Sequence, residues 1–289
     1  MTATGPTLLK LSLPLPSGKR LTLGERPLVM GILNVTPDSF SDGGRYLDPE
    51  AAVAHARAMV AAGADLLDIG GESTRPGSRP VDEAEERRRV LPVIARLARE
   101  LEVPLSLDTY KAAVAEAGLA AGADLVNDVT ALRADPALGR VAARYGAPVV
   151  LMHATGLPGT FHDPALRGAP LAAVLEGLAA AIARAEGAGI RPERILVDPG
   201  LGFGKTPEEN LALVREVPQL KRLGKPVVIG PSRKSFLAHA LGEADMAARE
   251  VGTAAAIAIA VFQGAEVVRV HEVATMRRVA RVAHAIRSA

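Results

Sequence analysis

Six polar or charged side chains lie at or just past the ends of short apolar runs of this chain and could act together at one site. They are Asp108, Asn127, Asp198, Lys234, Arg269 and His271. Two carboxylates and an amide can recognise a flat heterocycle through an amidine-like edge of N–H donors. A lysine, an arginine and a histidine suit an anionic group such as a phosphate. The residue types therefore indicate a site for a heterocycle that carries phosphate.

Some residues in the same kind of position have a simpler explanation. An aspartate or asparagine that follows a strand often caps the next helix. We expect that structural role for Asp68 and Asp128. Capping cannot explain the six residues above as a set, because they come from five different apolar runs.

Eight short apolar runs alternate with Ala-rich amphipathic stretches, and these elements must position the polar side chains. The runs are 27–34, 64–71, 103–108, 123–128, 147–153, 194–200, 225–230 and 265–271. The helical stretches are about 49–63, 82–101, 110–121, 135–145, 170–188, 207–217, 246–263 and 272–287. Strand–helix alternation predicts a parallel sheet, and near-continuous apolar strands predict that both faces are covered. Eight units favour an α/β fold of the closed (β/α)₈ TIM-barrel type over an open doubly wound sheet, the alternative.

The first 26 residues carry a separate signal. Residues 7–12 and 19–23 flank Pro16, Ser17 and Gly18, which is typical of a β-hairpin. We expect residues 1–26 to form a hairpin extension that caps the barrel bottom. Residues 27–289 would then form a single catalytic domain.

Composition excludes several kinds of chemistry. Hydrophobic residues make up 48% of the 289 residues and aromatics only 3%, so the core must be aliphatic. The absence of cysteine excludes disulfides, thiolate metal sites and a cysteine nucleophile. A net charge of +2 argues against a nucleic-acid partner. No signal-peptide pattern or membrane-length apolar run is present, so we expect a cytoplasmic protein that binds no membrane.

The longest irregular stretches follow predicted strands, at 35–48, 71–81 and 154–169. Long loops in a compact domain are usually functional, and in a barrel the loops after strands surround the active site. One tempting motif there is misleading: the run GLGFGKT from Gly200 to Thr206 lacks the first glycine of a Walker A loop, because residue 199 is proline.

Five runs resemble the dihydropteroate synthase family. They are GILNVTPDSFSDGG (Gly31 to Gly44), GESTRPG (Gly71 to Gly77), DPGLGFGKT (Asp198 to Thr206), SRKSF (Ser232 to Phe236) and RVH (Arg269 to His271). DTYK from Asp108, NDV from Asn127 and the pair Met152 and His153 fill the remaining family positions. After His153 the sequence reads ATGLPG, which departs from the family's usual Met-x-Gly pattern.

The resemblance implies a TIM-barrel transferase of folate biosynthesis, a family that sulfonamides target. Its members join a dihydropterin methyl diphosphate to 4-aminobenzoate, giving dihydropteroate and diphosphate by Mg²⁺-assisted, largely dissociative loss of the leaving group. The resemblance also implies a homodimer formed through the last helices. Two alternatives are a pterin-dependent methyltransferase of the same fold and a catalytically silent pterin-binding paralogue.

The resemblance also assigns roles to individual residues. Asp108, Asn127, Asp198 and Lys234 would bind the pterin ring, and Thr74, Arg269 and His271 would complete the pterin diphosphate site. Asn34 would hold Mg²⁺. The 4-aminobenzoate pocket would take Phe40, Arg75, Phe203 and Ser235. Asp42, in a loop expected to close over the pterin, would stabilise the cationic centre, and Lys234, Arg269 and His271 would share in catalysis.

Overall fold

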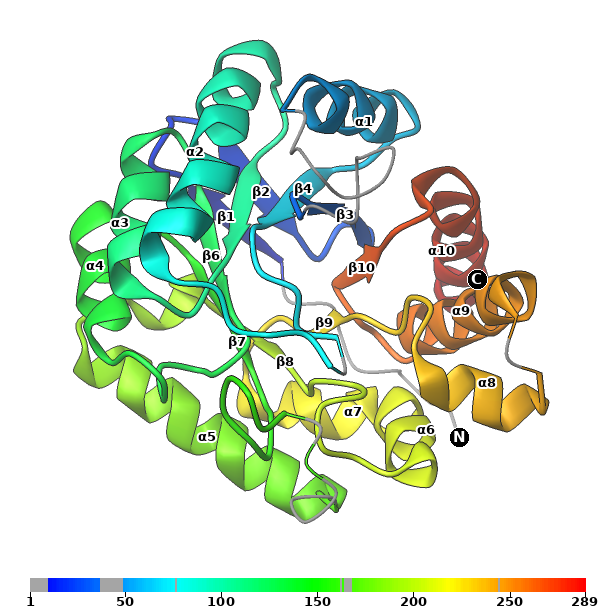
Figure 1. The fold of residues 1–289 in the computed structure, drawn as a ribbon. Coiled ribbons are helices and arrows are strands. Elements are labelled where there is room, and N and C mark those ends of the chain that lie inside the picture. Colours follow the sequence, from blue (N-terminus) through cyan, green and yellow to red (C-terminus); the bar gives the residue numbers. More distant parts are fainter. Residues whose placement is uncertain (1–9, 37–48, 76, 162, 164–167, 244) are drawn as a thin grey trace.

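Eight parallel strands form the centre of the molecule, surrounded by helices (Figure 1). The computed structural model describes residues 10–36, 49–75, 77–161, 163, 168–243 and 245–289. The barrel strands are β3 (Leu28–Asn34), β4 (Leu66–Gly70), β5 (Leu105–Asp108), β6 (Leu125–Asp128), β7 (Val149–Met152), β8 (Ile195–Asp198), β9 (Val228–Ile229) and β10 (Val267–Val270). Each lies within a predicted apolar run.

The hydrogen-bonded order of the strands shows that the sheet is a closed barrel. Its neighbours run β8-β7-β6-β5-β4-β3-β10-β9, all in parallel register. A parallel bridge between Val197 and Val227 joins β8 to the segment leading into β9. The prediction of a TIM barrel is therefore confirmed, and the open-sheet alternative is wrong.

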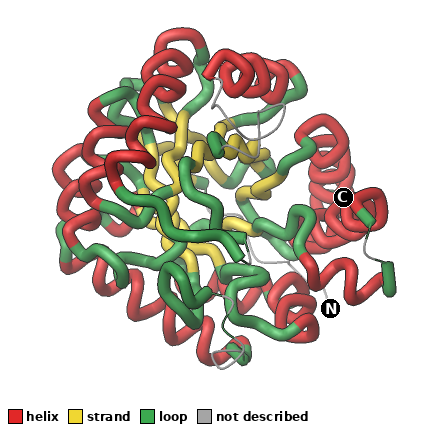
Figure 2. Tube along the Cα trace, viewed as in Figure 1, coloured by secondary structure: helices red, strands yellow, loops and turns green. Residues whose placement is uncertain are grey.

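Helices cover the outside of the barrel, as the red and yellow parts of Figure 2 show. The helices that follow barrel strands are α1 (Pro49–Ala61), α2 (Glu83–Glu100), α3 (Ala112–Ala120), α4 (Ala137–Tyr145), α5 (Leu171–Gly187), α6 (Pro207–Arg215), α9 (Met246–Phe262) and α10 (Val273–Ser288). Two short helices were not predicted: α7 (Val217–Leu220), where Pro218 starts a new helix after α6, and α8 (Ser235–Leu241). None of the helices that the structure describes is both long and apolar enough to cross a membrane.

An antiparallel hairpin closes the lower end of the barrel, where the strands begin. It consists of β1 (Leu11–Pro14) and β2 (Arg20–Leu23). Leu13, Leu21 and Leu23 pack in one buried cluster with the first inward residues of the strands, such as Leu66 and Leu125. Burial of a leucine side chain contributes roughly 1.5–3 kcal/mol, so the hairpin adds substantially to this hydrophobic floor.

Polar contacts fix the hairpin in place. Arg194, which precedes β8, donates to the carbonyl oxygen of Pro14 at 2.9 Å and also to that of Gly146. Lys19 donates from Nζ to the carbonyl oxygen of Val103 at 3.1 Å, in the turn that leads into β5. The hairpin is thus attached to segments at the amino ends of two strands, opposite the ends that carry the predicted site.

Candidate active site

A layer of polar side chains lies inside the barrel, directly above the hydrophobic floor. Residues two apart on a strand point to the same side of the sheet. Leu66, Leu125, Leu196 and Val267 belong to the floor cluster. Two residues further along the same four strands are Asp68, Asn127, Asp198 and Arg269. The strand period therefore places an acid, an amide, a second acid and a cation in one inward layer.

Asp68 lies at the centre of this layer, so the expectation that it caps a helix was wrong. Its Oδ2 atom accepts a hydrogen bond from Asn127 Nδ2 at 2.9 Å and one from Arg269 Nε at 2.6 Å. The side chain is fully buried. Arg269 also donates from Nη2 to Asp108 Oδ2 at 2.7 Å. The guanidinium thus joins the carboxylates of β4 and β5.

Asp128 has a structural role, but it does not cap the next helix as expected, because α4 begins only at Ala137 with Pro136 as its N-cap. Its carboxylate accepts from the backbone N–H and hydroxyl of Thr130, both at 2.8 Å, and from the backbone N–H of Leu132 at 2.6 Å. These bonds fix the turn after β6. Asp128 therefore does not belong to the inward polar layer.

Burial makes the two remaining carboxylates of the layer hard to ionise. It raises the pKa of Asp108, and the neighbouring charge of Asp68 acts in the same direction. Burial also raises the pKa of Asp198, while the Lys234 ammonium opposes the rise. Asp198 Oδ1 accepts from the backbone N–H of Gly200 at 2.6 Å, which orients it. A ligand that donates N–H groups to these carboxylates would favour their ionised form.

Lys234 reaches the same region from the turn after β9. Arg233, which precedes it, has a φ of 60°, and its backbone N–H donates to Thr253 Oγ1 at 3.1 Å. The Lys234 ammonium donates to the carbonyl oxygen of Leu201 and lies 5.0 Å from the centre of the Phe203 ring. Burial lowers the pKa of Lys234 to about 8, against the attraction of Asp198. The Lys234 ammonium therefore lies against the loop that follows β8.

Phe203 is held rigidly on that loop, and its partner Phe161 was not identified from the sequence. The two rings meet edge to face, with centroids 5.4 Å apart and planes at 83°. Lys205, buried nearby, donates from Nζ to the carbonyl oxygens of Phe203 at 3.0 Å and His153 at 3.1 Å. Phe161 lies in an irregular loop, where no periodicity marks it as a packing residue.

His271 directly follows β10 and contacts Ser232. Burial and then the positive charge of Arg269 lower its pKa to about 3. Ser232 Oγ lies 2.9 Å from His271 Nδ1 and accepts from the His271 backbone N–H at 3.2 Å. The residue types alone group Lys234, Arg269 and His271 as cations for an anionic group. The guanidinium of Arg269 instead contacts two carboxylates, and the low pKa of His271 keeps it neutral near pH 7.

Asn34 ends β3 at the same mouth of the barrel, beside β10. Its strand pairs with β10 at Gly31, opposite Val270, and with β4 at Asn34 itself, opposite Gly70. The side chain is half-buried. Within the described residues, no group of three or more histidine, cysteine, aspartate or glutamate side chains could hold a metal ion.

A cleft of about 360 Å³ opens between the loop after β4 and the loop after β7. Thr74 and Arg75 line one side, and Thr160 and Phe161 line the other.

Ser235 is exposed at the start of α8. Phe40 and Asp42 lie outside the described residues, so their predicted roles stay predictions.

Comparison with known proteins identifies the family to which this arrangement belongs. The family model described as "Pterin binding enzyme" matches residues 30–271. Dihydropteroate synthase of Synechocystis is 45% identical over 274 residues, covering 94% of this chain and 95% of the relative. That of Mycobacterium leprae is 46% identical over 252 residues, covering 85% of this chain and 88% of the relative. The chain belongs to the dihydropteroate synthase family.

Solved structures of other dihydropteroate synthases have the same fold. That of Xanthomonas albilineans with 4-aminobenzoic acid has a TM-score of 0.88 at 45% identity, covering 97% of this chain and 100% of that one. That of Yersinia pestis, in a complex with a sulfonamide drug, has a TM-score of 0.87 at 41% identity, covering 96% and 99%. These likenesses place the chain with the synthases rather than with the pterin-dependent methyltransferases, and make it a transferase.

Proposed function

We propose that this chain condenses a dihydropterin methyl diphosphate with 4-aminobenzoate, releasing diphosphate and forming dihydropteroate. The observation that carries the proposal is the inward polar layer, in which Asp68, Asp108, Asn127 and Asp198 face one another above a sealed floor. A dihydropterin presents an edge of N–H donors and ring acceptors that such carboxylates and an amide can pair with. Relatives solved with 4-aminobenzoic acid and with 7,8-dihydropteroate support the choice of substrates.

Pterin binding would exchange the partners of Arg269. Arg269 Nη2 donates to the carboxylate of Asp108. A pterin N–H edge that takes over Asp108 would leave one arm of the guanidinium without its acceptor. An arginine fork matches the geometry of phosphate oxygens, so the freed arm can turn to the diphosphate. Binding of the pterin ring would thus free Arg269 to bind the diphosphate.

Departure of diphosphate is the step that most needs electrostatic help, because charge develops on a polyanion. Lys234 and Arg269 supply fixed positive charge in a buried site, where such charge acts strongly. Asn34 fits a Mg²⁺ ion, because this ion takes oxygen ligands and is usually held by one or two protein groups together with substrate phosphates. Bound Mg²⁺ would neutralise charge on the leaving diphosphate.

The arylamine requires a binding pocket rather than a general base. An aniline nitrogen attacks with its lone pair and loses its proton afterwards, so no side-chain nucleophile is required. The cleft between the loops after β4 and β7 offers the Arg75 guanidinium for a carboxylate, and Phe161, which packs against Phe203, offers a ring surface. Diphosphate would depart first. The electron-rich dihydropterin would then delocalise the positive charge on the exocyclic carbon, and the amine would attack that carbon.

Substitution of the ring-binding residues tests the proposal. Asp198→Ala and Lys234→Ala should each abolish detectable pterin binding and turnover, because each removes a buried polar partner while leaving the barrel folded. Arg144→Ala, which removes an exposed ion pair with Glu116 on an outer helix, serves as the matched control. Binding measured by calorimetry and unfolding measured by circular dichroism separate the two effects. Wild-type affinity and turnover in either site variant would remove that residue from the pterin site.

We also propose that the chain forms a homodimer through α9 and α10. Ile259 and Phe262 of α9 and Val282 and Ile286 of α10 are large apolar residues exposed on neighbouring helices, and they line a shared groove of about 700 Å³. Contiguous exposed apolar surface of this kind marks an interaction site. The cytoplasmic location expected from the sequence stays a prediction.

A further inference from the structure

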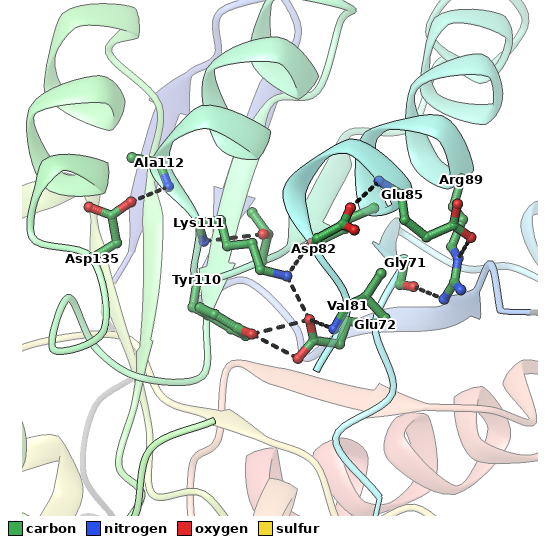
Figure 3. A network of polar contacts seen from close by, with 12 residues as sticks. Gly71, Glu72, Val81, Asp82, Glu85, Arg89, Tyr110, Lys111, Ala112 and Asp135 are labelled. Carbon is green, nitrogen blue, oxygen red and sulfur yellow. Dashed lines mark hydrogen bonds and ion pairs between the residues drawn. The ribbon is translucent and has the colours of Figure 1, made fainter. Parts of the chain in front are cut away.

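A buried network of polar and charged side chains lies beside the cleft and takes no part in the chemistry proposed above (Figure 3). Its members are Glu72, Glu86, Tyr110 and Lys111. They come from three segments: the loop after β4, the first turn of α2 and the junction between β5 and α3. The network therefore connects the cleft loop to the strand that carries Asp108.

Glu72 holds together the two ends of the cleft loop. It follows Gly71 at the end of β4, and its Oε2 atom accepts from the backbone N–H of Val81 at 3.0 Å. Val81 directly precedes Asp82, which caps α2. Arg89 adds a second attachment, since its Nη1 donates to the carbonyl oxygen of Gly71 at 2.8 Å. Both ends of the loop that carries Thr74 and Arg75 are thus fixed.

Tyr110 and Lys111 attach this closed loop to the segment after β5. The Tyr110 hydroxyl lies 2.9 Å and 3.1 Å from the two carboxylate oxygens of Glu72. Lys111 Nζ donates to Glu72 Oε2 at 2.6 Å and to Glu86 Oε2 at 2.5 Å. It also lies 4.7 Å from the centre of the Tyr110 ring. These two residues follow Asp108 by two and three positions.

Neutral hydrogen-bonding groups could also attach the loop to the segment after β5, so the charged side chains need a separate explanation. The side chains of Lys111, Glu72 and Glu86 are 12%, 8% and 1% exposed, so all three have lost most of their hydration. A buried ion pair gains little net stability over well-packed apolar residues, because desolvation offsets the attraction. Its hydrogen bonds do impose one geometry on the groups that they join. The network is therefore better suited to fixing the position of the loop than to stabilising the fold.

We propose that Glu72, Tyr110 and Lys111 are positioning residues that hold the cleft loop over the pterin-binding end of β5 and so set the affinity for the arylamine. The inference rests on the proposed function, in which Arg75 of this loop receives the carboxylate of 4-aminobenzoate. It adds three residues that the pterin and diphosphate sites do not use. Movement of the loop by about 1 Å would misplace Arg75 relative to its ligand.

The test compares variants that keep the fold intact. Glu72→Ala removes all the contacts of this carboxylate but leaves Lys111 and Glu86 as a balanced buried pair, so we expect the barrel to fold. Glu72→Gln keeps the shape and an acceptor for Lys111 and Val81. Tyr110→Phe removes a hydroxyl that reaches the cleft only through Glu72, which separates support of the loop from direct contact with a ligand. Arg88→Ala, which breaks an exposed pair with Glu85 on α2, is the control.

Steady-state kinetics should show a selective effect on one substrate. We expect Glu72→Ala to raise KM for 4-aminobenzoate roughly tenfold and Tyr110→Phe about threefold, with a clearly smaller rise in KM for the pterin diphosphate, which meets the same loop only at Thr74. Glu72→Gln should restore most of the loss. Backbone amides between Glu72 and Asp82 should exchange hydrogen faster in Glu72→Ala and Tyr110→Phe, and at the wild-type rate in Arg88→Ala.

Two outcomes would overturn the proposal. In one, both variants keep wild-type KM values and wild-type exchange of the loop amides. In the other, KM for the pterin diphosphate rises in parallel with that for the arylamine, which would assign the network to the barrel as a whole. If the wild-type protein makes no dihydropteroate, the proposed function fails, and hydrogen exchange still decides whether the network positions the loop.

Discussion

At the scale of single residues, the site depends on a polar side chain following an apolar one at the strand period. Leu66 and Asp68 on β4, and Leu125 and Asn127 on β6, are such pairs. The first residue of each pair seals the barrel, and the second faces the ligand space above it. Burial in this layer raises the pKa values of Asp108 and Asp198 and lowers that of Lys234, and the charge of Asp68 raises the pKa of Asp108 further.

His271 should take up a proton when a polyanion binds beside it. Its pKa of about 3 in the free protein keeps it neutral at pH 6, and a neighbouring diphosphate would favour the charged form and raise that pKa. Binding of diphosphate at pH 5–6 should therefore take up as much as ~1 additional proton per site relative to His271→Gln. Calorimetry in two buffers of different ionisation enthalpy measures the uptake. Equal uptake by the wild type and His271→Gln would show that His271 stays neutral in the complex.

The sequence predicted most of this layer, because a polar residue that ends an apolar run is visible without a structure. Asp68 was misjudged for a physical reason: an acid after a strand can equally cap a helix, and only the inward direction of its side chain decides. The contacts of Arg269 with Asp68 and Asp108 depend on how strands distant in sequence are placed around the ring, which composition and spacing do not show.

At the scale of elements, the loop after β8 is shaped by a close approach to the end of β7. Gly200 has a φ of +69°, and a Cβ added there would lie 1.9 Å from the carbonyl oxygen of His153. Its backbone N–H also orients Asp198. The eight strands and their following helices were predicted because short apolar runs alternate regularly with long amphipathic stretches. The helix α8 has only seven residues and begins two residues after Arg233, whose φ is positive, so no comparable pattern marks it.

Substitution of Gly200 by alanine should therefore damage both stability and the site. A side chain there must adopt a strained backbone and displace the His153 carbonyl, so we expect a loss of at least ~2 kcal/mol in the free energy of unfolding. Gly187→Ala is the matched control, because a Cβ added at that helical glycine would meet no atom within 4 Å and should be neutral or slightly stabilising. Urea unfolding measures both. An unchanged midpoint for Gly200→Ala would mean that the two loops separate freely.

At the scale of the whole molecule, one end of the barrel is sealed and the other is reactive. The hairpin of β1 and β2 covers the floor, and the loops after the strands surround the polar layer. The outer helices bury most of their apolar residues, but α9 and α10 leave a group of them exposed. The exposed apolar face of α9 and α10 could not be predicted from the sequence. An apolar residue on a helix gives the same pattern whether it packs on the barrel or on another molecule.

A charge introduced into the proposed dimer interface should lower the mass of the protein in solution from dimer to monomer. Val282 and Ile286 are 60% and 63% exposed, and an aspartate at either position would carry an unpaired charge into the interface. The wild-type chain should elute with twice its mass of 30.0 kDa in light scattering, and Val282→Asp or Ile286→Asp should shift it to the monomer. Arg281→Ala, an exposed substitution on the same helix, should stay dimeric. A wild-type protein that is monomeric at micromolar concentration would contradict the proposal.

The most direct measurement supplies the purified chain with the dihydropterin methyl diphosphate and Mg²⁺, with and without 4-aminobenzoate, and follows dihydropteroate by mass and diphosphate by enzymatic assay. We expect dihydropteroate only when the arylamine is present, in equal amount to the diphosphate released, and loss of turnover when a chelator removes Mg²⁺. A folded protein that binds the pterin diphosphate but forms no arylamine-dependent product would contradict the proposed function.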